Sequence, residues 1–279
     1  MTTPFGERLR RATVQRGPLC VGIDPHPALL RAWDLADDVA GLEAFSRTVV
    51  DALADRVAVL KPQSAFFERH GSRGIAVLER VLADSRAAGA LVLTDAKRGD
   101  IGSTMQAYAD AYADPSSPLF SDAVTASPYL GFGSLAPLLD TAERHGAGVF
   151  VLAVTSNPEG AEVQRARTAA GATVAGTVLE HVRRRNAGVA SGPLGSVGCV
   201  VGATVGRTGE DLDVGGPLLA PGLGAQGARP ADLREVFGAA LRLVLPAVSR
   251  EVLADGPGHR GLREAAARLR DACAEALRA

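Results

Sequence analysis

The sequence predicts a single α/β domain over residues 1–279, folded as a (β/α)8 TIM barrel. Three observations support this fold: short apolar runs alternate with amphipathic segments, the apolar runs number eight, and 279 residues suit a barrel that typically needs ~250. The runs are continuous Val, Leu and Ala rather than alternating polar and apolar residues, as expected for parallel strands covered on both faces. No shift in composition marks a linker, so we expect no second domain.

The expected elements follow one another in regular order after an amphipathic helix that ends near residue 16. The weakest unit is 204–218, where the glycine-rich sequence leaves room for only a stunted helix. The arginine run at 183–185 is expected to be a solvated helix end. Strands are expected at 19–24, 57–61, 91–97, 122–126, 148–154, 197–203, 217–220 and 243–250, and the principal helices at 41–53, 74–83, 105–112, 134–144 and 261–277, with a further helix ending near 185.

Composition argues against several classes of protein. A content of 47% hydrophobic and 22% charged residues describes a folded chain with a sizeable core, and a net charge of -1 argues against a nucleic-acid partner. Cys20, Cys199 and Cys273 lie far apart, and the five histidines lack metal-ligand spacing, so we expect neither a disulfide framework nor a metal site. The sequence shows no signal peptide and no apolar run that could span a membrane, which indicates a cytoplasmic protein.

The stretch 91–104 carries the candidate catalytic groups. Side chains two apart on a strand point to the same side, so Asp95 and Lys97 should project together from the end of this strand, with Asp100 in the following turn. An isolated Asp-x-Lys pair is more often a salt bridge. However, lysine occurs only at Lys61 and Lys97, each at the end of an apolar run, and the other 28 of the 30 basic residues are arginine. Because an ammonium can give up a proton, the two lysines indicate catalysis.

Barrel geometry should gather groups that lie far apart in the sequence, because the carboxyl ends of all strands meet on one face. The glycine-rich loop 221–227 follows the seventh strand and Arg250 ends the eighth, and these are the two places where such barrels usually bind a phosphate. Glycines let backbone N–H groups approach an anion closely. The residues expected to share one mouth are Asp24, Lys61, Asp95, Lys97, Ser156 and Arg250.

Three motifs resemble those of the orotidine 5'-phosphate decarboxylase family, over nearly the whole chain. They are Asp-Ala-Lys-Arg-Gly-Asp-Ile with a threonine three residues on (95–104), Thr-Ser-Asn-Pro (155–158) and Pro-Gly-Leu-Gly-Ala-Gln-Gly (221–227). The chain is most similar to the bacterial subgroup common in actinobacteria and myxobacteria. The resemblance implies a homodimeric lyase without cofactor or metal that converts orotidine 5'-monophosphate to uridine 5'-monophosphate and CO2, the last step of de novo pyrimidine synthesis. One departure is the shortened crossover at 206–216, which removes no motif residue.

The resemblance also implies roles for individual residues. Lys97 would be the proton donor to pyrimidine C6, in an alternating charge array with Lys61, Asp95 and Asp100. Asp100 would reach into the site of the partner subunit, although the sequence alone leaves its direction open. The substrate-binding residues would be Asp24 and Lys61 near the ribose hydroxyls, Ser156 at the pyrimidine edge, Gln226 between pyrimidine and phosphate with Pro221 in the same loop, Arg250 on the phosphate, and Ile101 and Thr104 together with Asp100.

Two alternatives stay open at this point. A relative on the same barrel decarboxylates or condenses sugar phosphates with Mg²⁺ and a similar Asp-x-Lys-x-x-Asp motif. Ser156 and Gln226 argue against it, and the acidic residue nearest after Lys61 is Glu68, seven residues on. The other alternative is a non-catalytic nucleotide-phosphate-binding protein that kept the barrel. The complete charge array argues against that alternative.

Overall fold

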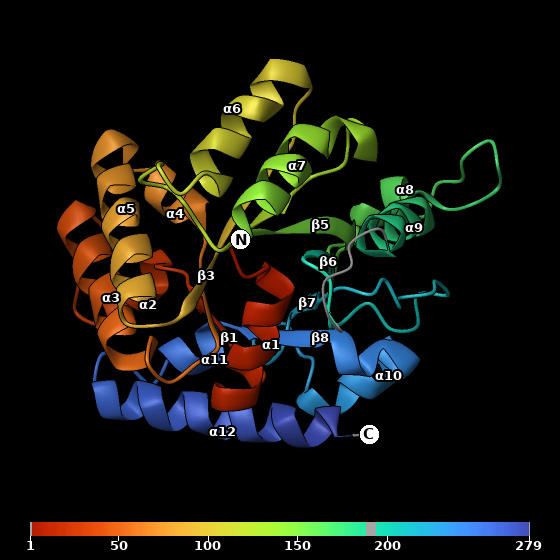
Figure 1. The fold of residues 1–279 in the computed structure, drawn as a ribbon. Coiled ribbons are helices and arrows are strands. Elements are labelled where there is room, and N and C mark those ends of the chain that lie inside the picture. Colours follow the sequence, from red (N-terminus) through yellow and green to blue (C-terminus); the bar gives the residue numbers. More distant parts are fainter. Residues whose placement is uncertain (1, 188–193, 279) are drawn as a thin grey trace.

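The structure, a computed structural model, describes residues 2–187 and 194–278, and its centre is a closed barrel of eight parallel strands (Figure 1). Strands β1 and β8 pair through Cys20 with Ala247 and Val21 with Val248, which closes the ring. The expected (β/α)8 barrel is confirmed. The strands are β1 (Cys20–Ile23), β2 (Val59–Pro62), β3 (Leu91–Arg98), β4 (Ala123–Ala126), β5 (Gly148–Val154), β6 (Val197–Val201), β7 (Leu218–Pro221) and β8 (Val244–Val248).

Helices cover the outside of the barrel, and in Figure 1 α12 runs along the lower edge beside α3 and α11. Short 3-10 helices, labelled η, occur in two of the connections. The helices are α1 (Phe5–Arg16), α2 (Pro27–Ala32), α3 (Val39–Leu53), α4 (Ser64–Glu68), α5 (Gly71–Ala87), α6 (Gly102–Ala113), η1 (Phe132–Leu135), α7 (Ala136–His145), α8 (Gly160–Gln164), α9 (Val174–Ala187), η2 (Pro230–Asp232), α10 (Leu233–Phe237), η3 (Gly238–Leu243), α11 (Arg250–Leu253) and α12 (His259–Leu277).

Helix α3 shows why these segments are helical. Asp38 caps its N-terminus, where the carboxylate accepts a hydrogen bond of 2.9 Å from the backbone N–H of Gly41. Apolar residues then recur every three or four positions, and Phe45, Val49 and Leu53 are fully buried against the barrel. The cap and the apolar stripe together fix both where this helix begins and which face it buries.

The interior of the barrel is filled by side chains, and α1 covers the end at which the strands begin. Phe5 of α1 lies under the strands with its ring centroid 5.9 Å from that of Phe150, in an edge-to-face arrangement. Gly148 leaves the space for this ring, because a Cβ there would lie 2.3 Å from an atom of Phe5. Arg8 forms an ion pair with the buried carboxylate of Asp122. Side chains therefore pack the interior of the barrel at this end.

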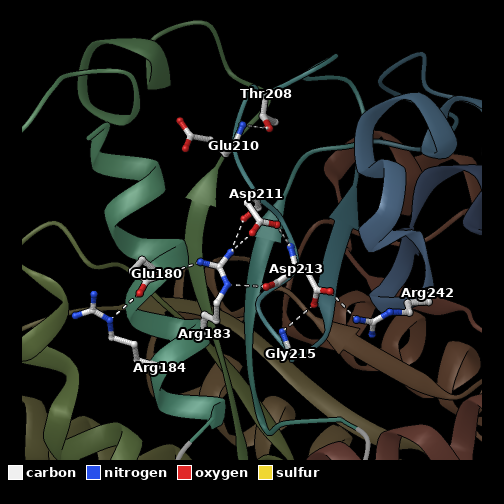
Figure 2. A network of polar contacts seen from close by, with 9 residues as sticks. All are labelled: Glu180, Arg183, Arg184, Thr208, Glu210, Asp211, Asp213, Gly215 and Arg242. Atoms are coloured by element: carbon white, nitrogen blue, oxygen red, sulfur yellow. Dashed lines mark hydrogen bonds and ion pairs between the residues drawn. The ribbon is translucent and has the colours of Figure 1, made fainter. Parts of the chain in front are cut away.

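The connection between β6 and β7 contains no helix in residues 202–217, so the expected stunted helix is wrong. Arg183 of α9 holds this segment instead, and so it is not a solvated helix end as the sequence indicated. Figure 2 shows its guanidinium donating to the carbonyl oxygens of Asp213 (2.8 Å) and Asp211 (3.1 Å). Asp213 in turn pairs with Arg242 at 2.7 Å. Glycines explain the missing helix, since three of them adopt left-handed φ angles: Gly206, Gly209 and Gly215.

The end of the last strand also differs from the prediction. Strand β8 ends at Val248, two residues earlier than expected, and Arg250 is the first residue of the four-residue helix α11. Ser249 between them adopts φ -141° and ψ -83°, which is not a strand conformation. Arg250 therefore follows the strand at the start of a short helix, and it still lines the mouth described below.

Candidate active site

A cavity of ≈ 380 Å³ opens at the carboxyl ends of the strands. Each of the eight strands, or the residue directly after it, contributes at least one side chain to its wall. All six residues expected to share the mouth line it, so the topology brings together groups that are up to 226 positions apart, from Asp24 to Arg250. The expected residues in its lining are Asp24, Lys61, Asp95, Lys97, Ser156, Pro221, Gln226 and Arg250.

A carboxylate lies between two ammonium groups on one side of this cavity. Lys61 Nζ donates to Asp95 Oδ2 at 3.1 Å, and Lys97 Nζ donates to Asp95 Oδ1 at 2.6 Å. The lysines differ in exposure, because the Lys61 side chain is 9% exposed and the Lys97 side chain 45%. Asp95 therefore holds both cations, and Lys97 is the more exposed of the two lysines that line the cavity.

The charges in this group support one another. Burial opposes ionisation of Asp95, but the ammonium groups of Lys61 and Lys97 hold the pKa of this carboxyl below its usual range. Burial likewise disfavours the charged form of Lys61, yet the carboxylates of Asp95 and Asp24 raise the pKa of Lys61 above its ordinary value. The buried pair is therefore ionised at neutral pH, and it places fixed charges at one side of the site.

Asp24 and Ser249 lie together at the ends of the neighbouring strands β1 and β8, and β1 also pairs with the strand β2 that carries Lys61. Both are close to Gly22, where an added Cβ would lie 2.8 Å from Asp24 Oδ2 and 2.9 Å from Ser249 Cβ. Asp24 Oδ1 and Ser249 Oγ are buried and have no hydrogen-bond partner among the described residues. Because both residues line the cavity, these two oxygens can bind the hydroxyl groups of a polar ligand.

The glycine-rich loop after β7 adopts the compact shape expected of an anion-binding turn. Gly222, Gly224 and Gly227 have φ angles of 110°, 69° and 95°, a region that other residues rarely adopt. Gln226 lies on this loop, and its Oε1 accepts a hydrogen bond of 3.0 Å from Ser156 Oγ after β5. Arg250 lines the same side of the cavity. Two loops thus meet over the cavity, beside an arginine.

Three of the expected site residues do not line the cavity of their own chain. Asp100 accepts a hydrogen bond of 2.8 Å from the backbone N–H of Ile101, and it makes no contact with Lys97. Ile101 is 62% exposed, and Thr104 is exposed on the first turn of α6. Asp100 is half-buried, Ile101 and Thr104 are exposed, and none of the three belongs to the lining of the cavity.

Several cavity residues were not singled out from the sequence, and each lies at a strand end like those that were. Thr125 was detectable because it is on the inward face of the strand 122–126, two positions after the buried Ala123. His26 follows Asp24 by two positions, and its ring is 4.5 Å from that of Phe66. The residues of this kind are His26, Gln63, Thr125 and Ser249, and the cavity is also lined by Thr155 and Asn157 of the motif at 155–158.

No cluster of three or more His, Cys, Asp or Glu side chains within residues 2–187 and 194–278 is arranged to hold a metal ion. The three cysteines are buried free thiols. Burial raises the pKa of the Cys20 thiol to about 12, so it is a poor nucleophile at neutral pH. The ionisable chemistry of the cavity therefore rests on its lysines, carboxylates, arginine and His26.

A closed parallel barrel with a lysine–carboxylate array and a glycine-rich loop at its C-terminal mouth defines a (β/α)8-barrel protein with the active site of an enzyme. The sequence then identifies the family to which the chain belongs. The chain belongs to the Orotidine 5'-phosphate decarboxylase / HUMPS family, whose sequence profile matches residues 17–265.

Similar proteins cover almost the entire chain. An orotidine 5'-phosphate decarboxylase of Salinispora arenicola is 67% identical over 274 residues, 98% of each chain, and that of Streptomyces coelicolor is 66% identical over 267 residues, 95% of each. A solved structure from Streptomyces avermitilis superposes with a TM-score of 0.97 at 63% identity, covering 100% of this chain and 97% of that one. The OMP decarboxylase of Leishmania donovani superposes with a TM-score of 0.77 at 30% identity, covering 99% and 100%. The expected likeness to the actinobacterial members is confirmed.

Proposed function

We propose that this chain decarboxylates orotidine 5'-monophosphate to uridine 5'-monophosphate and CO2, and is thus a carbon–carbon lyase of pyrimidine synthesis. The observation that carries the proposal is the Lys61–Asp95–Lys97 array at one side of a cavity whose other side holds Gln226 and Arg250. Such a cavity can hold a phosphate at one end and a reacting carbon at the other. The names of the two relatives that are 66–67% identical support the same reaction.

Lys97 is the group that acts on the reacting carbon. Loss of CO2 leaves a carbanion at C6 that the pyrimidine ring cannot delocalise well, and a fixed ammonium stabilises this charge as it develops. The same ammonium then delivers a proton to C6. Asp95 keeps Lys97 charged and oriented through the 2.6 Å hydrogen bond. The Lys61 ammonium donates to the other oxygen of Asp95 and stabilises the negative charge of this carboxylate.

The rest of the cavity binds the nucleotide. Arg250 and the loop 221–227 hold the phosphate, with Pro221 at the start of the loop. Ser156 and Gln226, which are already hydrogen-bonded to each other, contact the pyrimidine edge. Asp24 and Lys61 take the ribose hydroxyls, and the unpartnered Oδ1 of Asp24 supports this role. Binding energy from the remote phosphate helps to close the loops over the base.

The active form is a homodimer with shared sites. Asp100, Ile101 and Thr104 do not line the cavity of their own chain, which supports a role in the cavity of a second subunit. Exposed apolar side chains accompany them, since Tyr129 is 77% and Leu130 52% exposed. The β3 and β4 loops that carry these residues lie together, because Ser127 N–H donates to Arg98 O at 2.8 Å. An apolar edge at the barrel mouth fits a two-fold interface.

We further propose that residues 1–279 form one domain and that the protein acts in the cytoplasm, on a small molecule and without a cofactor. No described helix combines the length and the apolar character that crossing a membrane requires. The closed barrel uses strands from Cys20 to Val248, and α12 then packs back on α3, which supports a single folding unit.

The alternatives from the sequence gain no support. A magnesium-dependent relative would want an additional acidic ligand near Lys61, whereas the Glu68 carboxylate is taken up by an ion pair with Arg98 and does not line the cavity. A non-catalytic binding protein would not need two buried charges beside a half-exposed lysine. Burying a charged pair costs desolvation free energy that the attraction within the pair need not offset, so a protein that only binds its ligand gains little from it.

A spectrophotometric assay tests the proposal directly. The purified protein is mixed with orotidine 5'-monophosphate, and the loss of its ultraviolet absorbance is followed with and without EDTA. We expect turnover that is insensitive to EDTA. Absence of turnover at micromolar enzyme would refute the proposed reaction, and a loss that only Mg²⁺ restores would favour the sugar-phosphate relative.

A further inference from the structure

The backbone at Lys97 is held in an unfavourable conformation. Its φ angle is +49°, in the left-handed region that residues with a side chain rarely adopt. The register between β3 and β4 shifts between Thr94 and Arg98, so Lys97 lies in a bulge of strand β3. A conformation of this kind persists only where neighbouring groups enforce it.

Thr125 on β4 is the neighbour that enforces it. Its Oγ1 accepts a hydrogen bond of 2.9 Å from the backbone N–H of Lys97. The same Oγ1 donates at 2.8 Å to Asp95 Oδ1, the oxygen that also receives the Lys97 ammonium. Thr125 is 1% exposed, so water cannot replace either bond readily.

The two hydrogen bonds of the Thr125 hydroxyl fix each other's direction. A hydroxyl has one hydrogen and two lone pairs, and the hydrogen given to Asp95 leaves a lone pair directed toward the Lys97 N–H. The hydroxyl thereby ties the main chain of Lys97 to the carboxylate that orients its ammonium. A valine has the same shape and makes neither bond, whereas a serine makes both.

We infer that Thr125 is a positioning residue for the decarboxylation, which fixes Lys97 from the backbone side and Asp95 from the carboxylate side. The inference rests on the proposed function, because it concerns the lysine that delivers the proton. Thr125 lines the cavity from β4 while Gln226 and Arg250 line it from the β7 and β8 loops. Its loss is therefore expected to affect the chemical step and to leave binding of the nucleotide phosphate nearly unchanged.

The test compares Thr125→Val and Thr125→Ser with the control Thr94→Val. Thr94 is also fully buried on a neighbouring barrel strand, and its hydroxyl bonds Ser121 Oγ at 2.6 Å without lining the cavity. We expect Thr125→Val to lower kcat by about 10- to 100-fold, the effect of a small misplacement of a reacting group, with KM changed by less than about threefold. Thr125→Ser should restore most of the turnover, and Thr94→Val should keep wild-type kcat per folded molecule.

The outcomes separate this inference from the proposed function. If the wild-type protein does not decarboxylate the nucleotide, the proposed function itself fails. If the wild type is active and Thr125→Val has a normal kcat, the inference about the Thr125 hydroxyl fails and the proposed function stands. The same holds if Thr125→Ser is as impaired as Thr125→Val. A rise in KM without loss of kcat would assign Thr125 to binding and overturn the inference as well. If Thr125→Val does not fold, Thr125→Ala removes the hydroxyl without adding bulk and is judged by the same kinetic criteria.

Discussion

The Nζ atom of Lys97 lies 2.6 Å from Oδ1 of Asp95, two residues earlier on the same strand. The pair is formed within one chain and one strand, so the orientation of this ammonium does not depend on a second subunit. In the proposed dimer, a second subunit would contribute the remaining acidic group, Asp100. The role of the Lys97–Asp95 pair and the role of Asp100 can be tested separately.

Replacing Lys97 by Ala or by Arg is expected to abolish decarboxylation and to leave a folded protein. Arginine keeps the positive charge beside Asp95, but a guanidinium does not give up a proton at neutral pH. The measurement is the ultraviolet assay at high enzyme concentration, with circular dichroism to verify folding. Near-normal turnover by Lys97→Arg would contradict the role of Lys97 as proton donor.

Removing the guanidinium of Arg250 is expected to weaken binding of the phosphate. Arg250→Ala should lower kcat/KM by about one to two decades, since a charged hydrogen bond contributes ~1.5–3 kcal/mol. Arg268→Ala is the control, because Arg268 pairs with Asp255 on the surface at 2.7 Å and does not line the cavity. Unchanged kinetics of Arg250→Ala would place the phosphate elsewhere.

Asp95 is expected to make the fold sensitive to acid. Burial opposes its ionisation, but the two lysines hold its pKa below the unfolded value of about 3.9, so below that pH the unfolded chain binds the proton first and stability falls. Asp95→Asn should be less stable at pH 7, because it leaves the buried Lys61 ammonium without its nearest carboxylate. The gap to wild type should narrow as the pH falls below about 4.

Thermal unfolding of both proteins between pH 7 and pH 3 measures this gap. Asp51→Asn on the exposed face of α3 serves as the control and should follow the wild-type curve. A stability difference between Asp95→Asn and wild type that stays constant over the whole range would show that the charge of Asp95 does not contribute.

Asp100 is expected to complete the partner's site. Lys97→Ala and Asp100→Ala should each be nearly inactive, whereas a mixture that exchanges subunits should recover activity. A mixed dimer has one site with both defects and one with neither, so random pairing gives roughly a quarter of wild-type activity from symmetry alone. Verified heterodimers without activity would mean that Asp100 acts within its own chain.

Arg183 is expected to stabilise the helix-free connection between β6 and β7. Arg183→Ala removes hydrogen bonds to the carbonyl oxygens of Asp211 and Asp213 and should cost about 1–3 kcal/mol. Amide hydrogen exchange should quicken in residues 208–216. The matched control is Arg184→Ala, since the Arg184 guanidinium bonds Glu180 on its own helix (Figure 2). Equal exchange in the two variants would contradict this role.

The barrel and most of its mouth were predictable because they depend on patterns that recur along the chain. Continuous apolar runs identified all eight strands, and the strand ends identified Asp24, Lys61, Asp95 and Lys97. Their common location follows from topology alone, since parallel strands in a closed barrel end on one face.

The parts that could not be predicted depend on how neighbouring strands are aligned. The hydroxyl of Thr125 reaches both Asp95 and Lys97 only because the register of β3 and β4 shifts there, and no sequence pattern encodes that shift. Arg183 looked like one of several arginines at a helix end. Its role appears only when the glycine-rich segment, which lacks a helix, lies against α9.

Lysine is confined to two positions in this chain, and both belong to the cavity. The Lys61 side chain is 9% exposed and held by Asp95, whereas that of Lys97 is 45% exposed. Of the two ε-amino groups in residues 1–279, that of Lys97 is the one open to an acylating reagent, at a pH high enough to remove its proton. Amine labelling, which elsewhere modifies many surface lysines, would here report on the active site, and a bound nucleotide should protect Lys97 from the reagent.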